Sequence, residues 1–179
     1  QRISVALSFK YLAEPAAQTF YPPEHHGEMV ARLYAHIGAA SHRFLAPPPD
    51  SAAALPPEGE VCTDLFLTEN CAEIHVLRYG QNTLHEVRRT LRDLCLKNIA
   101  AIQLFLGLAD PGTHLLTAEF EKMGFFFAGI LPMTPVGDAL ILQYLNNVRI
   151  DYDKLVLYTG EARMIRDYVR AQDPQRDLL

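Results

Sequence analysis

Residues 101–125 read AIQLFLGLADPGTHLLTAEFEKMGF and carry the clearest structural pattern in the chain. The apolar run at 101–106 has the length of a strand, and its lack of alternation predicts a central strand covered on both faces. Asp110-Pro111 suits the N-cap and first position of a helix, and Gly124 suits its end. The segment therefore predicts a strand, a helix and a second strand beginning at Phe125.

The residues before this segment predict a hairpin and a helix. Residues 61–67 and 72–79 have strand-like composition, and the short connection between them favours antiparallel pairing. In the helix that follows, Thr83 and Glu86 match a capping box, a pair of side chains that satisfies the free N–H groups of a first helical turn. Its apolar stripe is formed by Leu84, Val87, Leu91, Leu94 and Cys95.

The remaining elements are predicted at the two ends of the chain. Strands at 125–131 and 139–145 flank a turn-rich stretch, and a last helix is expected from about Gly160 to Ala171. The N-terminal part predicts a strand at 2–11, a helix from Pro23 to a stop at Gly38, and a Pro- and Ala-rich loop at 41–59. Alternating strands and helices predict an α/β (α+β) fold with a mixed, partly parallel sheet.

Composition limits the classes of function. A chain of 179 residues with 49% hydrophobic residues fits one globular domain. The net charge of −5 argues against nucleic acid as a partner. Since no apolar run approaches the roughly 20 residues of a membrane span, we expect a soluble, cytoplasmic protein without membrane contact. The chain begins at Gln1 and runs directly into a strand-like segment, so we expect it to be part of a longer polypeptide.

Two groups of residues bear on metal binding, and no metal site is predicted from either. His25 and His26 stand near Glu28, but adjacent side chains diverge on a helix and no third ligand follows at a suitable spacing. Asp151 and Asp153 lie on one side of an extended segment, where helix capping or exposure to solvent is the simpler explanation.

Residues 118–125, AEFEKMGF, resemble the late helix-to-strand corner of the GNAT family of N-acyltransferases, whose usual form is Leu-Tyr-Glu-Lys-Leu-Gly-Phe. The order of elements between residues 72 and 145 agrees with that family. More narrowly, residues 124–129 and 137–145 are similar to bacterial proteins that fuse an anti-sigma-factor-type ATPase domain to a GNAT-like domain.

The resemblance implies a domain organisation and a setting. Residues 1–179 would form a single GNAT-like domain with a partly parallel sheet and helices on both faces. An N-terminal strand and helix would occupy residues 1–40, and a loop would follow at 41–60. The core GNAT half would span 61–145, and a C-terminal extension would span 146–179. The protein would belong to bacterial signalling, with a fused ATPase domain or a regulatory protein as partner.

The resemblance also places a coenzyme A site. The family carries Arg/Gln-x-x-Gly-x-Gly/Ala after the strand that ends near Tyr79, and backbone N–H groups of this loop hold the pyrophosphate at a helix N-terminus. Here the loop reads RYGQNT at 78–83, so only Gly80 remains of the glycines. The residues that would bind acetyl-CoA or another acyl-CoA are Val76, Leu77, Gly80, Gln81, Asn82 and Thr83.

The catalytic groups are altered as well. In the family, the following helix often carries an Asn and a Tyr that protonates the departing thiolate, and these positions fall on Thr113 and Phe120. Phe has no proton to give. Glu73 and His75 alternate on one side of the strand that would line the acceptor cleft, which makes them candidates for a general base, although an exposed sheet face also explains them.

Three hypotheses remain open at this point. The altered loop and Phe120 favour a sensory or protein-interaction module with little acetyltransferase activity. An active N-acyltransferase is the alternative, because direct transfer needs mainly positioning and a polarised carbonyl. A homodimerisation domain is the third, since Phe126, Ile141 and Tyr144 could support a buried partner surface, although core packing explains them as well.

Overall fold

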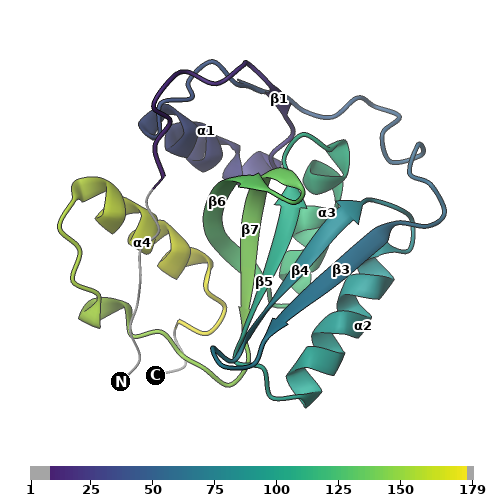
Figure 1. Ribbon diagram of the computed structural model, residues 1–179, viewed down its shortest axis with the longest axis vertical. Coiled ribbons are helices and arrows are strands. Elements are labelled where there is room, and N and C mark those ends of the chain that lie inside the picture. The colour runs from purple at the N-terminus through teal and green to yellow at the C-terminus, as the bar shows by residue number, and fades with distance from the viewer. Residues whose placement is uncertain (1–8, 177–179) are drawn as a thin grey trace.

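The computed structural model describes residues 9–176, which form a twisted mixed sheet with helices packed against it (Figure 1). The strands are β1 Thr19–Phe20, β2 Arg43–Phe44, β3 Glu60–Phe66, β4 Cys71–Arg78, β5 Ala101–Gly107, β6 Phe126–Thr134 and β7 Gly137–Leu145. The helices are α1 Gly27–His36, α2 Thr83–Leu96, α3 Pro111–Lys122 and α4 Gly160–Gln172, with short 3-10 turns η1 Glu24–His26 and η2 Tyr152–Lys154.

The main sheet has the strand order β3-β4-β5-β7-β6. β3 and β4 form the predicted antiparallel hairpin, and β4 runs parallel to β5, from Cys71 opposite Ala101 to Val76 opposite Leu106. β7 pairs antiparallel with both β5 and β6. The predicted central position of β5 is confirmed, because this strand occupies the middle of the sheet. The predicted α/β class and partly parallel sheet are confirmed with it.

One face of the sheet carries the main hydrophobic core. Ile74, Leu104 and Leu142 lie on this face, and buried side chains from all four helices join the same core cluster or pack against it. The opposite face carries a smaller cluster around Phe105 and Ile141, to which no helix within residues 9–176 contributes. Helices were expected on both faces, but within residues 9–176 no helix packs on the part of the sheet around Phe105 and Ile141. In Figure 1, α2 lies along the β3–β4 edge and α4 lies beside β6.

The N-terminal part differs in detail from the prediction. The expected helix from Pro23 is divided into η1 and α1, and Gly38 follows with a φ of 88°, the left-handed stop that was expected. Residues 1–8 of the predicted first strand lie outside the described residues, and 9–11 form no strand. The loop at 41–59 contains β2, which pairs in parallel with β1.

The helix ends in the C-terminal part follow from the sequence. Asp110 caps α3 by accepting a hydrogen bond from the Gly112 N–H at 2.8 Å, and Gly124 ends that helix at a φ of 99°. The turn between the last two strands is shorter than expected, since β6 continues to Thr134 and β7 begins at Gly137. Within residues 9–176, none of the helices combines the length and the apolar character needed to cross a membrane.

Candidate functional site

The predicted phosphate loop lies between β4 and α2, and the backbone donors of Gly80 and Gln81 are engaged within the chain. The Gly80 N–H donates to the Thr83 hydroxyl oxygen at 2.8 Å. The Gln81 N–H donates to the carbonyl oxygen of Pro56 at 2.8 Å. A phosphate that approached this loop would have to displace both acceptors, because an N–H group has one proton to donate.

The segment 55–59 covers this loop. The Gly59 N–H donates to Oδ1 of Asn82 at 2.7 Å, and Nε2 of Gln81 donates to the carbonyl oxygen of Leu55 at 3.2 Å. Gly59 and Gly80 pack so closely that a Cβ atom on Gly80 would lie 2.1 Å from the Gly59 nitrogen. The Pro-rich stretch, which the sequence indicates only as a loop, thus occupies the space beside Gly80 where the resemblance predicted a pyrophosphate.

The predicted capping box is wrong. α2 begins at Thr83, whose hydroxyl accepts from Gly80 behind it instead of from the first turn ahead. The Glu86 carboxylate accepts from Arg89, 2.5 Å away. The obstacle to a phosphate at this helix is therefore the covering segment together with the Gly80–Thr83 hydrogen bond, and not a Thr83–Glu86 cap.

A hollow opens where β4 and β5 separate. The pairing of these strands ends at Val76 and Leu106, before β4 ends at Arg78. Beyond this point the hollow has a volume of about 310 Å³, and its lining includes Val76, Leu77, Tyr79, Gly107, Asp110 and Val136. Two of the predicted coenzyme-binding residues, Val76 and Leu77, border it. The other four, at 80–83, do not.

Tyr79 forms one wall of this hollow, and its hydroxyl is committed to the interior. The Thr113 hydroxyl donates to the carbonyl oxygen of Gly107, so Tyr79 donates to Oγ1 of Thr113 at 2.7 Å. Burial raises the pKa of Tyr79. The ring packs against Gly112, where a Cβ atom would lie 2.3 Å from it. Tyr79 therefore cannot take the place of the general acid that the resemblance implies at position 120, and Phe120 is fully buried in the core.

Glu73 and His75 lie on the face of the sheet opposite the main core, as their alternation predicts. His75 is only 2% exposed, and its Nε2 lies 3.3 Å from a Glu73 carboxylate oxygen. A second carboxylate, from Asp64 on β3, lies 3.5 Å from the same nitrogen. Sequence reasoning missed Asp64, because its place beside Glu73 depends on the β3–β4 register. Neither candidate base lines the hollow.

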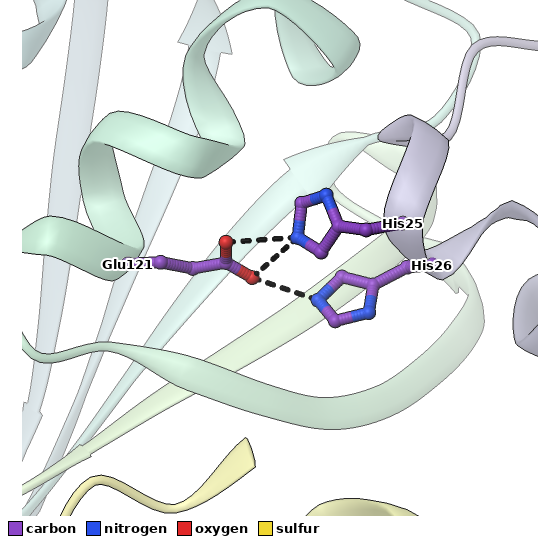
Figure 2. Close-up of side chains that lie close together, drawn as sticks. All are labelled: His25, His26 and Glu121. Carbon is purple, nitrogen blue, oxygen red and sulfur yellow. Dashed lines mark hydrogen bonds and ion pairs between the residues drawn. The ribbon is translucent and has the colours of Figure 1, made fainter.

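A second polar cluster connects the turn η1 with the helix α3. Nε2 of His25 lies 2.8 Å and 3.0 Å from the two carboxylate oxygens of Glu121, and Nε2 of His26 lies 2.7 Å from one of them (Figure 2). The expectation that the histidines diverge is wrong. They lie in the tight turn η1, where their ring centroids are 4.1 Å apart. The third group comes from a residue far along the chain, so no local spacing could reveal it.

The surroundings of this cluster favour the ionised carboxylate. Burial raises the pKa of Glu121, but hydrogen bonds from His26 and His25 outweigh burial and hold the pKa below its usual range. On the other side of His26, the Tyr168 hydroxyl from α4 lies 2.6 Å from Nδ1. Burial raises the pKa of Tyr168, and the charges of Glu121 and Glu28 add to that effect.

The remaining sequence candidates have structural roles. Phe126 and Ile141 are buried within this chain, and Tyr144 is half-buried against Phe125, so these three residues form no exposed partner surface. The Asp151 carboxylate pairs with Lys154 at 2.7 Å, and that of Asp153 pairs with Arg170 at the same distance. Both carboxylates therefore have cationic partners within the chain.

Three candidate sites thus lie in the described part of the chain: a covered loop at 80–83, a hollow at the ends of β4 and β5, and a cluster of two histidines with Glu121. No protein-family model matches the chain, and no curated protein matches it.

Proposed function

We propose that this chain is a GNAT-like domain of a bacterial signalling protein and acts as a sensory or protein-interaction module with little acetyltransferase activity. The strand and helix order from β4 to β7 is the order that the resemblance implies between residues 72 and 145. A fused ATPase domain or a separate regulatory protein would be the partner to which the module responds.

The observation that carries this proposal is the cover on the phosphate loop. Coenzyme A binding of the family type requires free backbone donors at the N-terminus of α2. Here the donors of Gly80 and Gln81 are engaged, and Gly59 lies directly against Gly80. Pyrophosphate would have to displace the segment 55–59 and lose the hydrogen bonds that this segment makes, so the bound state of coenzyme A is disfavoured.

Calorimetry with two ligands tests the proposal. Acetyl-CoA carries the pyrophosphate, whereas S-acetylpantetheine carries the same thioester arm without it. We expect acetyl-CoA to bind no more tightly than the fragment, because the covered loop gives the pyrophosphate no favourable contact. Micromolar binding of acetyl-CoA, together with acetylation of an amine acceptor, would overturn the proposal.

The hollow beyond Val76 favours an active N-acyltransferase as the second candidate. A thioester arm could enter where β4 and β5 separate, with backbone groups near Val76 and Leu77 positioning its carbonyl. In this reading Glu73 or His75 would serve as the general base through a water molecule, since neither lines the hollow. Acetyl transfer that falls at least tenfold in His75→Ala and in Glu73→Gln would favour this candidate.

A further inference from the structure

The Tyr168 hydroxyl contacts His26 at the ring nitrogen that does not face Glu121. The Tyr168 hydroxyl lies 2.6 Å from Nδ1 of His26 and 3.2 Å from the carbonyl oxygen of His25. The hydroxyl has one proton, which it donates either to Nδ1 of His26 or to the carbonyl oxygen of His25. In the first arrangement, a neutral His26 carries its proton on Nε2 and donates it to Glu121. In the second, the Tyr168 oxygen accepts the Nδ1–H of His26, and a neutral His26 directs a bare Nε2 lone pair at Glu121.

That lone pair faces an acceptor at close range. Nε2 of His26 lies 2.7 Å from a Glu121 carboxylate oxygen, and two acceptors at this distance repel each other unless a positive charge lies between them. His26 is fully buried, so water cannot screen the repulsion. Nε2 of His25 lies 2.8 Å from the other oxygen of the same carboxylate, so both rings approach Glu121 from η1 (Figure 2). The cluster is thus shaped around a small cation, either a proton on Nε2 or a metal ion.

We propose that His25, His26 and Glu121 form a binding site for a divalent transition metal, with Zn²⁺ as the ion that fits best. Imidazole nitrogen suits zinc and its neighbours better than Mg²⁺ or Ca²⁺, which prefer oxygen. Two histidines and one carboxylate are a donor set found around zinc with an open fourth position. Metal-bound histidines usually donate the N–H of their second ring nitrogen to a nearby oxygen, which fixes the tautomer and the orientation of the ring. The Tyr168 hydroxyl oxygen is placed to accept that hydrogen bond from Nδ1 of His26.

The geometry of the cluster needs only a small adjustment to accept the ion. With metal–ligand bonds of about 2.0–2.1 Å, neighbouring donor atoms in a tetrahedral site lie about 3.3 Å apart. The present nitrogen–oxygen separations of 2.7 to 3.0 Å must widen by a few tenths of an ångström, and all three donor atoms already lie within 4.8 Å of one another. His25 can supply this movement because its side chain is 46% exposed, and the same exposure gives the ion a path from solvent.

The cluster of Asp64, Glu73 and His75 is the weaker candidate within the described residues. It offers one imidazole and two carboxylates, and the Asp64 side chain is 63% exposed. Its histidine stacks on Phe105 with ring centroids 4.4 Å apart, and no hydroxyl orients either ring nitrogen. The two imidazole ligands and the contact of Tyr168 with His26 therefore both favour the site at His25. A metal there would tie η1 to α3, and this role is independent of the coenzyme A loop and of the function proposed above.

The experiment is calorimetric titration of the metal-stripped full chain with Zn²⁺, together with Co²⁺ absorbance as a report on coordination. We expect one ion per chain with a tetrahedral Co²⁺ spectrum. His25→Ala and Glu121→Gln should each weaken Zn²⁺ binding at least tenfold. Tyr168→Phe keeps all three ligands but removes the orienting oxygen, so it should weaken binding about tenfold to a hundredfold.

His85→Ala and Glu119→Gln are the matched controls, because they change the same residue types at positions outside the cluster. Both should bind Zn²⁺ as the unaltered chain does. The proposal is overturned if the unaltered chain does not bind Zn²⁺, or if binding persists undiminished in His25→Ala and Glu121→Gln. Loss of binding in His75→Ala but not in His25→Ala would also overturn it, since the ion would then lie at the other cluster. Thermal denaturation of each variant confirms that it is folded.

Discussion

Gly59 and Gly80 pack backbone against backbone, which closes the N-terminal end of α2 with a segment of the same chain. A Cβ atom on Gly80 would lie 2.1 Å from the Gly59 nitrogen, and one on Gly59 would lie 2.5 Å from the Thr83 hydroxyl oxygen. Such distances leave room only for hydrogen at both positions. The glycine that resembles a remnant of a phosphate loop thus serves here to let a covering segment approach.

Gly80→Ala should therefore destabilise the protein. The added methyl group meets backbone atoms of Glu58 and Gly59, which cannot rotate away as the end of a side chain can. Overpacking of this kind costs about 1–3 kcal/mol, measured as the free energy of unfolding in denaturant. Gly160→Ala is the control, because nothing lies within 4 Å of its Cβ position, and its stability should be unchanged or slightly higher. Equal stability of the two variants would contradict the close packing.

Leu104→Ala should be more costly than an equivalent change on the surface. Leu104 is fully buried on β5 at the middle of the sheet, so its truncation leaves a cavity and costs about 2–5 kcal/mol in the free energy of unfolding. Leu96→Ala is the matched control, because Leu96 is 72% exposed at the end of α2. A loss under about 1 kcal/mol for Leu104→Ala would mean that the strand is not central.

Local patterns predicted most of the elements of this fold. The apolar run at 101–106, the Asp110 cap and Gly124 each depend on neighbours within a few residues, and each occurs where the sequence indicates. The capping box failed because residues before the helix take the groups that it needs, one of them three residues away and one of them distant in the chain. The Thr83 hydroxyl is bonded to Gly80, and Asn82 is bonded to Gly59, so contacts from outside the helix override the local pattern.

The polar cluster at Glu121 and the cover on the loop at 80–83 depend on contacts between residues far apart in the sequence, which a local pattern cannot predict. Glu121 reaches His26 across 95 positions of sequence, and segment 55–59 reaches Gln81 across about 25. The sequence predicted that Glu73 and His75 share a face, because alternation is local, but Asp64 joins them only through strand register. Sequence reasoning therefore predicted a coenzyme site at 76–83 but did not predict that the segment 55–59 covers residues 80 and 81.

The N-cap of α3 gives a prediction at the edge of the hollow. Asp110 accepts from the Gly112 N–H at 2.8 Å, so Asp110→Ala leaves this donor without its side-chain partner. The expected loss is about 0.5–2 kcal/mol in the free energy of unfolding. Asp110→Asn keeps the accepting oxygen and should retain most of that stability. Equal losses for Asn and Ala would show that the negative charge stabilises the site, and not the hydrogen bond.

Buried tyrosines predict a loss of stability at alkaline pH. Burial raises the pKa of Tyr34, and the charge of Asp138 and a hydrogen bond to it add to that effect; burial also raises the pKa of Tyr79. Below the ordinary phenol pKa of about 10, both states keep the proton and stability is complete. Above it, the unfolded chain loses protons that the folded chain retains. Each such phenol then lowers the free energy of unfolding by about 1.4 kcal/mol per pH unit.

Urea denaturation between pH about 8 and about 11 measures this slope. Tyr34→Phe removes one of the buried phenols, so its free energy of unfolding should fall less steeply above pH about 10 than that of the unaltered chain. Tyr158→Phe alters an exposed phenol and serves as the control, with an unchanged slope. If Tyr34→Phe and the unaltered chain lose stability in parallel, the Tyr34 phenol does not contribute to the alkaline transition.

The last prediction concerns the cover on the phosphate loop. Asn82→Ala removes the oxygen that holds the Gly59 N–H, and so loosens the segment 55–59 over Gly80 and Gln81. One such hydrogen bond is worth about 0.5–1.5 kcal/mol, so the affinity for inorganic pyrophosphate should rise by up to about tenfold in calorimetry. Glu86→Gln is the discriminating control: it removes a negative charge near the same helix end but leaves the cover in place. We expect Glu86→Gln to bind pyrophosphate as weakly as the unaltered chain. A gain in Glu86→Gln without a gain in Asn82→Ala would show that charge, and not the covering segment, keeps phosphate away from this helix.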